Sequence, residues 1–521
     1  MTIVPRSPAP LTRSTRALDE PAVGPAITPT ATTTTTPLTT ALLQQTAAAP
    51  HTAITGEAPP TSTARSTGTN PAALRDPIAA HRAQLKSDLK VAMSTLATLP
   101  PALTFFGGAR IKPSDPYYAI STEIGRLLAE RGVPPRTGAG PGIMQSVPEG
   151  YVAHRNALEA AGTRVSPSAQ LRQIEGLGDT ASLDDVRTQG FNIKLPHEQK
   201  LNPVIEVARE IQLFPFRKLA LYENARGVVT FPGGFGTLDE LFEIWTLSSA
   251  GKLSDPLAVV GADFWKPTLQ ALQKVAIDER PLIKQADFDR LFVTDSASEL
   301  LDHMLTSSPA PRGFEQPAGA LEKTLLKEVD VATRGMKTLR PAVAFIGGES
   351  LRVDDKALAI VKDIVGAVAG RGVAVRVGDG GTGSQAVVDA AKAVGASGKQ
   401  VQQIAWSAST ITTSTTPPAA TFSERIPHKE LLLRSAEAYV VLPAGLKGLD
   451  EFATVLCQMQ TGKLPKRPLV LVGSDYWQPI LDAWKSTMLS PERKLIAPED
   501  MDLVTVVDSA EAATAALTNL R

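Results

Sequence analysis

Short apolar runs alternate with amphipathic stretches along most of the chain. In the first half, Ala102 to Phe106 is apolar, and the stretch from Tyr117 to Glu130 has helical periodicity. Further apolar runs follow at Gly227 to Phe231, Leu257 to Gly261 and Leu291 to Thr294. Short apolar strands separated by helices are typical of a parallel sheet that helices cover on both faces. The pattern therefore predicts a doubly wound, Rossmann-like α/β fold, in which ligands bind at the carboxyl ends of the strands.

One segment departs from this pattern. Residues Val133 to Arg136 stand where a central strand is expected, but they include two prolines, which donate no hydrogen bond to a strand ladder. We therefore expect an edge or irregular strand at this place. The second half of the chain has a regular apolar run at the corresponding position, Val373 to Val377.

The chain contains this domain twice. Leu99 to Gly108 matches Leu339 to Gly348 at an offset of 240 residues, and Pro232 to Glu240 matches Pro443 to Glu451 at an offset of 211. Because the offset falls by 29, the second copy is shorter between its second glycine loop and the helix that contains His428. Internal repeats of this kind indicate two tandem domains of one architecture.

The repeat sets the expected domain boundaries. We expect the first repeat at residues 83–308, a Pro- and Gly-rich linker at 309–320 and the second repeat at 321–521. Residues 1–82 are rich in Ser, Thr and Pro and bury too little apolar surface to fold, so they predict a disordered tail. The alternative for this tail is a leader for a specialised bacterial secretion system, which would make the protein an exported effector.

Composition narrows the class of protein. The 53 basic and 53 acidic residues balance, so we expect no nucleic acid and no anionic membrane as a partner. No apolar run approaches the about 18 residues of a transmembrane helix, and a cytoplasmic location is expected. Cys457 is the only cysteine, which excludes an internal disulfide, and the six histidines lack metal-ligand spacing, so no metal site is predicted.

Three glycine-rich loops follow predicted strands of the first repeat. They are Gly107 to Arg110, Thr137 to Gly142 and Pro232 to Thr237, and the second of them leads into Met144. Glycines let backbone N–H groups approach a phosphate closely, and a helix N-terminus adds a partial positive charge. Three such loops in one domain predict a phosphate or nucleotide site.

Two charged positions have two interpretations each. Thr237 and Glu240 have the spacing of a capping box, but the same helix end is expected to face the ligand crevice, where a carboxylate can contact ribose or water. Arg217 and Lys218 begin a helix, where cations oppose the helix dipole. They are either a solvated surface pair or the neighbours of a bound anion.

These motifs together resemble one family. Pro232 to Glu240 fits the PGGxGTxxE signature of the "Lonely Guy" (LOG) phosphoribohydrolases, long labelled lysine decarboxylases, and Arg217-Lys218 matches the Arg-Lys pair of that family. Gly138 to Met144, Phe106 to Arg110 and Gly190 to Pro196 resemble its other motifs, in the same order. The resemblance covers all of the first repeat.

The resemblance implies roles for single residues. Arg217 and Glu240 are expected to be catalytic. The expected substrate- and phosphate-binding residues are Gly108, Arg110, Gly138, Gly140, Gly142, Met144, Lys218, Gly233, Gly234, Gly236 and Thr237. The family also implies that no metal or organic cofactor is needed and that the two repeats dock as a pseudo-dimer within one chain, with further homo-oligomers as an extension.

The expected activity is hydrolysis of the N-glycosidic bond of cytokinin or ordinary purine and pyrimidine nucleoside 5′-monophosphates, which yields a free base and ribose 5-phosphate. A carboxylate near the ribose ring stabilises the oxocarbenium-like transition state and orients water. The alternative is a non-catalytic nucleotide- or molybdenum-cofactor-binding carrier of the same fold superfamily. Lysine decarboxylation is not expected, since no lysine has the setting of a pyridoxal phosphate site.

The second repeat lacks several of the motif residues. Its substitutions relative to the first repeat are His428 for Arg217, Ser350 for Arg110, Ala444 for Gly233, Lys447 for Gly236 and Gly448 for Thr237. Lys429 and Glu451 are retained. Loss of the guanidinium and of part of the phosphate loop predicts a pseudo-enzyme domain, in which Lys447 could still contact a phosphate.

Overall fold

The computed structural model describes residues 76–163, 187–195, 201–307, 318–378, 380–406 and 418–518. All of these residues belong to one compact unit, Thr69–Arg521, which holds both repeats. The predicted tail up to residue 75 and most of the predicted linker lie outside the described residues.

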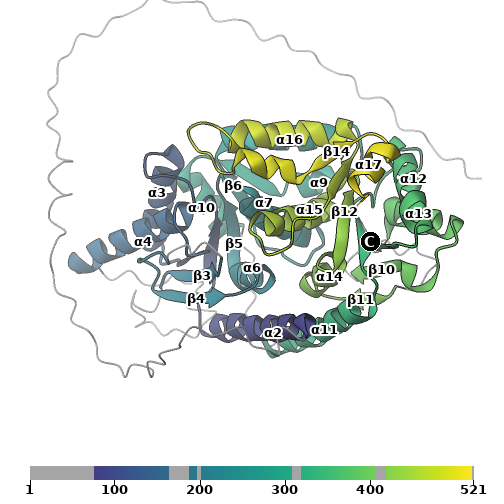
Figure 1. The fold of residues 1–521 in the computed structure, drawn as a ribbon. Helices are drawn as coiled ribbons and strands as arrows, with labels where there is room; N and C mark the ends of the chain where they lie inside the picture. Colours follow the sequence, from purple (N-terminus) through teal and green to yellow (C-terminus); the bar gives the residue numbers. More distant parts are fainter. Residues whose placement is uncertain are drawn as a thin grey trace, which may run out of the picture. The chain divides into compact units, whose positions relative to one another are not determined.

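The first repeat is built on a parallel sheet of seven strands in the order β4-β3-β2-β1-β5-β6-β7 (Figure 1). The order reverses direction at β1, which pairs with β2 on one side and β5 on the other. Such a reversal opens a ligand crevice at the carboxyl ends of the strands. The strands are β1 (Ala102–Phe106), β2 (Pro135–Thr137), β3 (Gln189–Ile193), β4 (Val207–Ile211), β5 (Ala225–Thr230), β6 (Leu257–Val260) and β7 (Leu291–Thr294).

The second repeat has the same sheet, in the order β11-β10-β9-β8-β12-β13-β14. All of its pairings are parallel, and β8 occupies the central position of β1. Two such sheets confirm the predicted doubly wound fold in two copies. The strands are β8 (Ala342–Ile346), β9 (Ala374–Gly378), β10 (Val401–Trp406), β11 (Ala420–Phe422), β12 (Ala436–Val441), β13 (Leu469–Val472) and β14 (Thr505–Val507).

The helices also recur in corresponding pairs. In the first repeat they are α2 (Pro77–Leu96), α3 (Pro116–Glu130), α4 (Ile143–Ala160), α6 (Phe214–Tyr222), α7 (Phe235–Ser249), α8 (Ala262–Leu272), α9 (Gln285–Phe288) and α10 (Ala297–Thr306), with a π-helical turn at Gln273–Asp278. In the second they are α11 (Ala318–Thr338), α12 (Lys356–Gly370), α13 (Gly381–Ala393), α14 (Arg425–Leu433), α15 (Leu446–Gln460), α16 (Ser474–Met488) and α17 (Ala510–Ala516), with 3-10 turns at Gly398–Gln400 and Pro498–Leu503.

Equivalent helices begin with the same local chemistry. The side chain of Asp115 accepts a hydrogen bond from the Tyr117 amide at the start of α3, and Asp355 accepts one from the Ala357 amide at the start of α12. An aspartate at this position satisfies a helix amide that has no partner within the helix. The internal repeat therefore extends to the individual residues that cap equivalent helices.

Three sequence expectations about the fold need correction. The expected edge or irregular strand, β2, begins at the second proline, Pro135, and is a short central strand paired with β1 and β3. The carbonyl of Pro134 accepts a hydrogen bond from Leu103, so this residue joins the ladder through the group that proline keeps. Helix α2 begins at Pro77, within the predicted tail, and α11 begins at Ala318, within the predicted linker.

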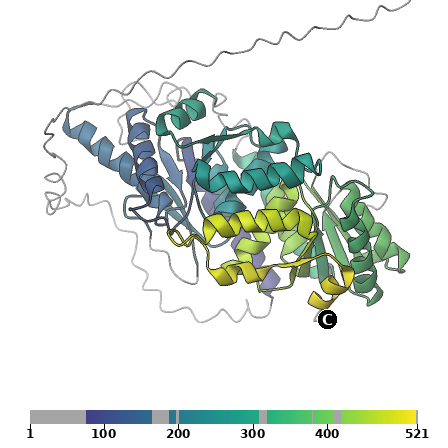
Figure 2. The same cartoon turned by 90° about the horizontal axis from the view of Figure 1, so that it is seen from above.

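Helices of one repeat pack against their own counterparts in the other. Helix α7 contacts α15, α2 lies along α11 (Figure 1), and α8 lies along α16 (Figure 2). Contact between equivalent elements is what a two-fold arrangement of two copies produces. Each repeat is therefore covered by the other on the same three elements.

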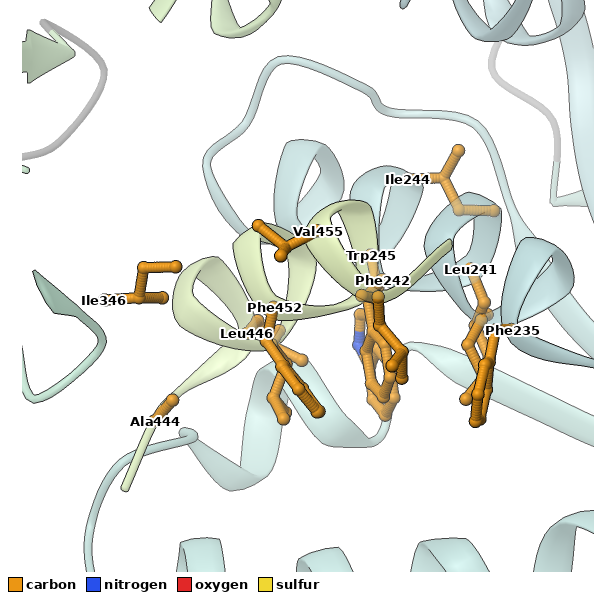
Figure 3. Close-up of a cluster of buried hydrophobic side chains, with 14 of the residues drawn as sticks. Phe235, Leu241, Phe242, Ile244, Trp245, Ile346, Ala444, Leu446, Phe452 and Val455 are labelled. Atoms are coloured by element: carbon orange, nitrogen blue, oxygen red, sulfur yellow. The ribbon is translucent and has the colours of Figure 1, made fainter. Parts of the chain in front are cut away.

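Part of this contact is apolar. Figure 3 shows side chains of α7 and α15 together, among them Phe242, Trp245 and Phe452. The ring of Phe235 lies 6.2 Å from that of Trp484 in α16, so aromatic packing crosses from one repeat to the other. Complete burial of one such side chain contributes about 1.5–3 kcal/mol.

Within the described part of the chain, no helix is long and apolar enough to cross a bilayer.

Candidate functional site

The third glycine loop leads directly into α7. The N-cap of this helix is Gly234, and Thr237 is its third residue, with its amide bonded to the Gly234 carbonyl at 3.0 Å. The predicted capping box is therefore wrong, because Thr237 is not the N-cap and Glu240 lies one turn further along. The Glu240 carboxylate is consequently not committed to the helix end.

Glu240 is instead paired with Arg217. The Nη1 atom of Arg217, on α6, lies 2.8 Å from Oε1 of Glu240, on α7. The Nε atom of the same guanidinium donates to the carbonyl of Phe191 on β3 at 3.0 Å. Both side chains of the pair are less than a tenth exposed. The two residues that the family motif marks as catalytic thus meet at the carboxyl ends of the strands.

Arg217 keeps donors for a ligand. A guanidinium has five N–H donors, and within the described part of the chain Arg217 uses two, one to Phe191 and one to Glu240. The remaining donors lie over the second glycine loop, since a Cβ atom placed on Gly138 would be 2.1 Å from Nη2 of Arg217. Only glycine fits at position 138 with this arginine in place.

The surroundings change the acidity of Glu240. Burial raises the pKa of the Glu240 carboxyl above its ordinary value, and the neighbouring Arg217 opposes only part of that rise. A carboxyl whose pKa moves toward neutrality is suited to exchange a proton with water or substrate.

The three glycine loops contact one another, and the second of them lies beside this pair. The Gly108 amide donates to the carbonyl of Pro232 at 2.8 Å, which joins the first loop to the third. Gly142, in the second loop, has a φ of +68°, and a Cβ there would lie 2.2 Å from the Gly108 carbonyl. A Cβ on Gly138 would also approach the sulfur of Met144 to 2.7 Å. The structure thus brings predicted residues of all three loops together.

Position 233 is closed to any larger residue. A Cβ on Gly233 would lie 2.0 Å from Oγ1 of Thr237, so this glycine and this threonine depend on each other. Gly234 and Gly236 complete the loop at the N-terminus of α7, where backbone amides and the helix dipole favour an anion.

The second repeat supplies part of this site, which the sequence did not reveal. The carbonyl of Lys494 accepts a hydrogen bond from Nη1 of Arg110 at 3.1 Å. The carbonyl of Leu495 would be 2.9 Å from a Cβ on Gly234, and Sγ of Cys457 would be 3.9 Å from one on Gly236. The first repeat's loops are therefore covered by a segment more than 200 residues away in the chain.

A family model covers both repeats. The family is described as "possible lysine decarboxylase", and its model matches residues 178–304 and 381–517, just over half of the chain. The chain belongs to this family, the LOG family.

Two solved structures are similar to this LOG protein. The molybdenum cofactor binding protein from the phototrophic bacterium Rippkaea orientalis is 15% identical, over 40% of this chain and 96% of its own, with a TM-score of 0.27. The structural-genomics target TM1055 is 19% identical, over 40% of this chain and 99% of its own, with a TM-score of 0.25. No curated protein sequence matches the chain.

Lys218 of the LOG motif does not face the ligand crevice. Its ammonium group is buried and lies 2.8 Å from Oδ1 of Asp239, and it also forms an ion pair with Glu243. Although burial works against the charge, the two carboxylates raise the pKa of Lys218. We therefore remove Lys218 from the expected substrate-binding residues and assign it to the contact between the repeats.

That contact contains a buried cluster of charges from both LOG repeats. Lys429, the counterpart of Lys218, lies 2.7 Å from both Glu243 and Asp450. Asp239, Glu243 and Asp450 have oxygens within 4.8 Å of one another, close enough to hold a metal ion. Three protein cations, Lys218, Lys429 and Arg425, form ion pairs with these carboxylates.

In the second LOG repeat a different arginine replaces the missing one. His428 stands in the place of Arg217, and it is buried. Burial, and then the nearby Arg425, lower the pKa of His428 well below its ordinary value, so the imidazole is neutral. Nη1 of Arg425, one helical turn earlier on α14, lies 2.9 Å from Oε1 of Glu451. The expectation that this repeat lacks a guanidinium is therefore wrong.

Arg425 differs from Arg217 in the N–H donors that remain available to a ligand. Its Nε donates to Asp450 at 2.9 Å and its Nη2 donates to the carbonyl of Lys447 at 3.1 Å, while Nη2 also lies 2.8 Å from the same Asp450 oxygen in an ion pair. Its Nη1 donates to Glu451 and to Nδ1 of His428 at 3.1 Å. Every nitrogen of this guanidinium therefore has a partner within the protein. Arg425 and His428 are three residues apart on α14, so they lie on the same face of the helix. This spacing is the sequence signal that could have identified Arg425.

Proposed function

We propose that the first repeat hydrolyses the N-glycosidic bond of nucleoside 5′-monophosphates to a free base and ribose 5-phosphate. The observation that carries this proposal is the pair of Arg217 and Glu240, 2.8 Å apart beside the second of three glycine loops that contact one another. A protein that only binds nucleotides has no need of a buried carboxylate beside an arginine with unused donors.

The phosphate is expected at the start of α7. The amides of the third loop and the hydroxyl of Thr237 can hold its oxygens, and the helix dipole favours its charge. This contact is remote from the bond that breaks. Its binding energy can therefore position the ribose against the catalytic pair.

The reacting groups divide the developing charges between them. As the bond to the base weakens, positive charge grows on the ribose ring and negative charge on the base. The Glu240 carboxylate stabilises the ring and directs a water molecule to the anomeric carbon, taking up its proton. The free N–H donors of Arg217 stabilise either the departing base or the phosphate.

Lysine decarboxylation has little support from the lysines near this pair. A lysine that forms a Schiff base must lose its proton, but the pKa of Lys218 is raised by Asp239 and Glu243, against the effect of burial. Lys218 is also buried between these carboxylates. No step through pyridoxal phosphate is therefore derived.

A product assay tests the proposal. The full chain is incubated with AMP, GMP, CMP, UMP, a cytokinin riboside monophosphate and adenosine, and ribose 5-phosphate and free base are measured. We expect equal amounts of both products from at least one monophosphate, and none from adenosine. Glu240→Gln should abolish this release, whereas Glu130→Gln, an exposed carboxylate on α3, should not.

Two results would reject the proposal. One is that no monophosphate gives product while the protein still binds nucleotide, which would favour the carrier. The other is that the Glu240→Gln chain releases product as fast as the wild type.

A further inference from the structure

A cavity of about 250 Å³ lies at the carboxyl ends of the strands of the second sheet. This volume approaches that of small-ligand pockets, which begin at about 300 Å³. Both repeats form its walls. The second repeat contributes Glu349, Ser350, Trp406, Gly445, Leu446 and Lys447, and the first contributes Thr246, Ser249 and Ala250 at the end of α7 together with residues 281–284 and Asp287.

This cavity corresponds to the catalytic site of the first repeat. A Cβ on Gly445 would lie 2.4 Å from the carbonyl of Leu282, just as one on Gly234 would lie 2.9 Å from that of Leu495. Each third glycine loop is thus covered by the same segment of the other repeat. The chain therefore has two equivalent positions for a ligand, and the second keeps an open volume.

The third loop of the second repeat has changed without collapsing. In the first repeat, Thr237 occupies the space that a Cβ on Gly233 would need. In the second, the side chain has moved to the other position: Ala444 carries a methyl group, and a Cβ on Gly448 would lie 2.7 Å from it. The two substitutions exchange which position carries the side chain, so the shared space stays occupied while the hydroxyl and the methyl group of the threonine are lost.

A cation is retained over the second glycine loop. In the first repeat that cation is Arg217, beside Gly138. In the second repeat it is Lys447, whose Nζ would be 3.3 Å from a Cβ on Gly378, the counterpart of Gly138. Lys447 belongs to the first turn of α15, so its charge adds to that of the helix N-terminus. An anionic group is the ligand that this end of the cavity favours.

The rest of the wall combines polar side chains with an apolar part. The apolar part includes the indole of Trp406, the side chains of Leu446 and Leu282, and Ile283. An aromatic or apolar group is favoured beside such a wall. The carboxylate of Glu349 is the opposing feature, at 3.9 Å from Nζ of Lys447. At that distance the ion pair is weak, and a phosphate can compete with it.

Cleavage is not expected in this cavity. Its lining includes neither Arg425 nor Glu451. Every nitrogen of the Arg425 guanidinium has a partner within the protein, and the face of the guanidinium lies over the Trp406 ring at 4.9 Å. The charged pair is thus held behind the wall of the cavity.

We propose that the second repeat binds a phosphate monoester with an aromatic group, of the nucleoside monophosphate class, and does not cleave it. The phosphate lies at the start of α15 beside Lys447, and the aromatic group lies against the apolar part of the wall. This inference does not require turnover in the first repeat.

Calorimetric titration of the full chain with AMP tests the proposal, in a Glu240→Gln background that prevents turnover. The stoichiometry should include one site per chain that Lys447→Glu removes or weakens by about tenfold or more, as expected for one charge-assisted contact. Glu349→Gln should tighten the same site about threefold, because it removes the competing carboxylate. The two opposite changes distinguish a role in binding from a loss of folding.

Further ligands identify which part is recognised. Ribose 5-phosphate and inorganic phosphate should bind more weakly than AMP but remain sensitive to Lys447→Glu, and adenosine should be insensitive to it. The proposal is overturned if Lys447→Glu leaves the stoichiometry and affinity for AMP unchanged, or if Lys447→Glu alone abolishes release of ribose 5-phosphate by an otherwise wild-type chain. Whether the wild type cleaves AMP is a separate result, which tests only the proposed function.

Discussion

The two repeats place a guanidinium beside the same motif glutamate in different ways. In the first repeat, Arg217 reaches Glu240 and keeps donors that face the glycine loops. In the second, Arg425 reaches Glu451 from one turn earlier, and each of its guanidinium nitrogens has a partner within the protein. On our proposal the first pair is a reactive site and the second is a structural brace. What decides between them is the number of donors left for a ligand, which is not visible in the motif.

The largest predicted effect comes from removing each arginine. Arg217→Ala should lower turnover about 10²- to 10³-fold, as for loss of one positioned charge-stabilising group, with a modest change in stability. Arg425→Ala should instead lower the free energy of unfolding by about 3–5 kcal/mol, because it removes the cation paired with buried Glu451 and one of the two cations paired with buried Asp450.

Turnover per folded molecule and urea denaturation check this contrast between the arginines. Equal losses of turnover in the two variants, measured on folded protein, would mean that both repeats are catalytic.

The exchange of side chains in the third loop gives the next prediction. Gly233→Ala should destabilise the protein by about 1–3 kcal/mol, since the new methyl group meets Thr237. The double change Gly233→Ala with Thr237→Gly copies the second repeat and should recover most of that stability. It should still raise KM for a monophosphate, because the hydroxyl is lost.

Thermal unfolding and steady-state kinetics of both third-loop variants supply the test. Gly448→Thr is the matched control, because it recreates the clash in the second repeat, with Ala444. If the double variant were as unstable as the single one, the two positions would not share one volume.

The hydrolytic activity proposed for the first repeat should be lost at acid pH. The mechanism uses ionised Glu240, and its pKa is raised above the ordinary value of 4.5 by burial, which Arg217 only partly offsets. Activity should therefore be complete above this raised pKa. It should fall about tenfold for each pH unit below it.

The pH profile of kcat/KM between pH 4 and 8 measures the position of this acid limb. Glu240→Gln should show no such limb in its residual activity. A wild-type limb at or below pH 4.5 would contradict the assigned role of Glu240.

The smallest predicted effect concerns the docking of the first helix. His81 on α2 lies 2.7 Å from Glu430 on α14, a contact between the repeats. Burial alone would raise the pKa of Glu430, but Arg434 and His81 together lower it to about 2. A depressed pKa stabilises the fold above the unfolded pKa, and that stability is lost as pH falls from about 4.5 toward 2.

His81→Ala should therefore reduce stability at pH 7 by about 1–2 kcal/mol and flatten its acid dependence. Lys337→Gln, which removes an exposed ion pair with Asp76 on the same helix pair, is the control and should change little. If His81→Ala and Lys337→Gln lowered stability equally, the buried contact of His81 would contribute no more than the exposed ion pair of Lys337.

The fold could be predicted because its signals are local. Strand and helix patterns, caps such as Asp115 and Asp355, and the internal offset all lie within short windows of sequence. The prediction of an edge or irregular strand at the prolines is wrong, because Pro134, which cannot donate a hydrogen bond, still accepts one through its carbonyl.

The site could be predicted only in part, because its remaining components come from long-range packing. The motif located Arg217 and Glu240, which the structure pairs. It could not show that Lys218 turns toward the other repeat, or that Leu495 covers the loop of the first. These positions depend on how the two repeats pack. Matching the repeats position by position also overlooks Arg425, because it does not stand at the position that corresponds to Arg217.

Release of ribose 5-phosphate by three chains tests the central claim most directly: Glu240→Gln, Glu451→Gln, and both changes together. If one repeat is catalytic and the other braced, Glu240→Gln should be as inactive as the double variant. Glu451→Gln, measured on folded protein, should stay near the wild type. Activity that survives Glu240→Gln and disappears only in the double variant would contradict this division of roles.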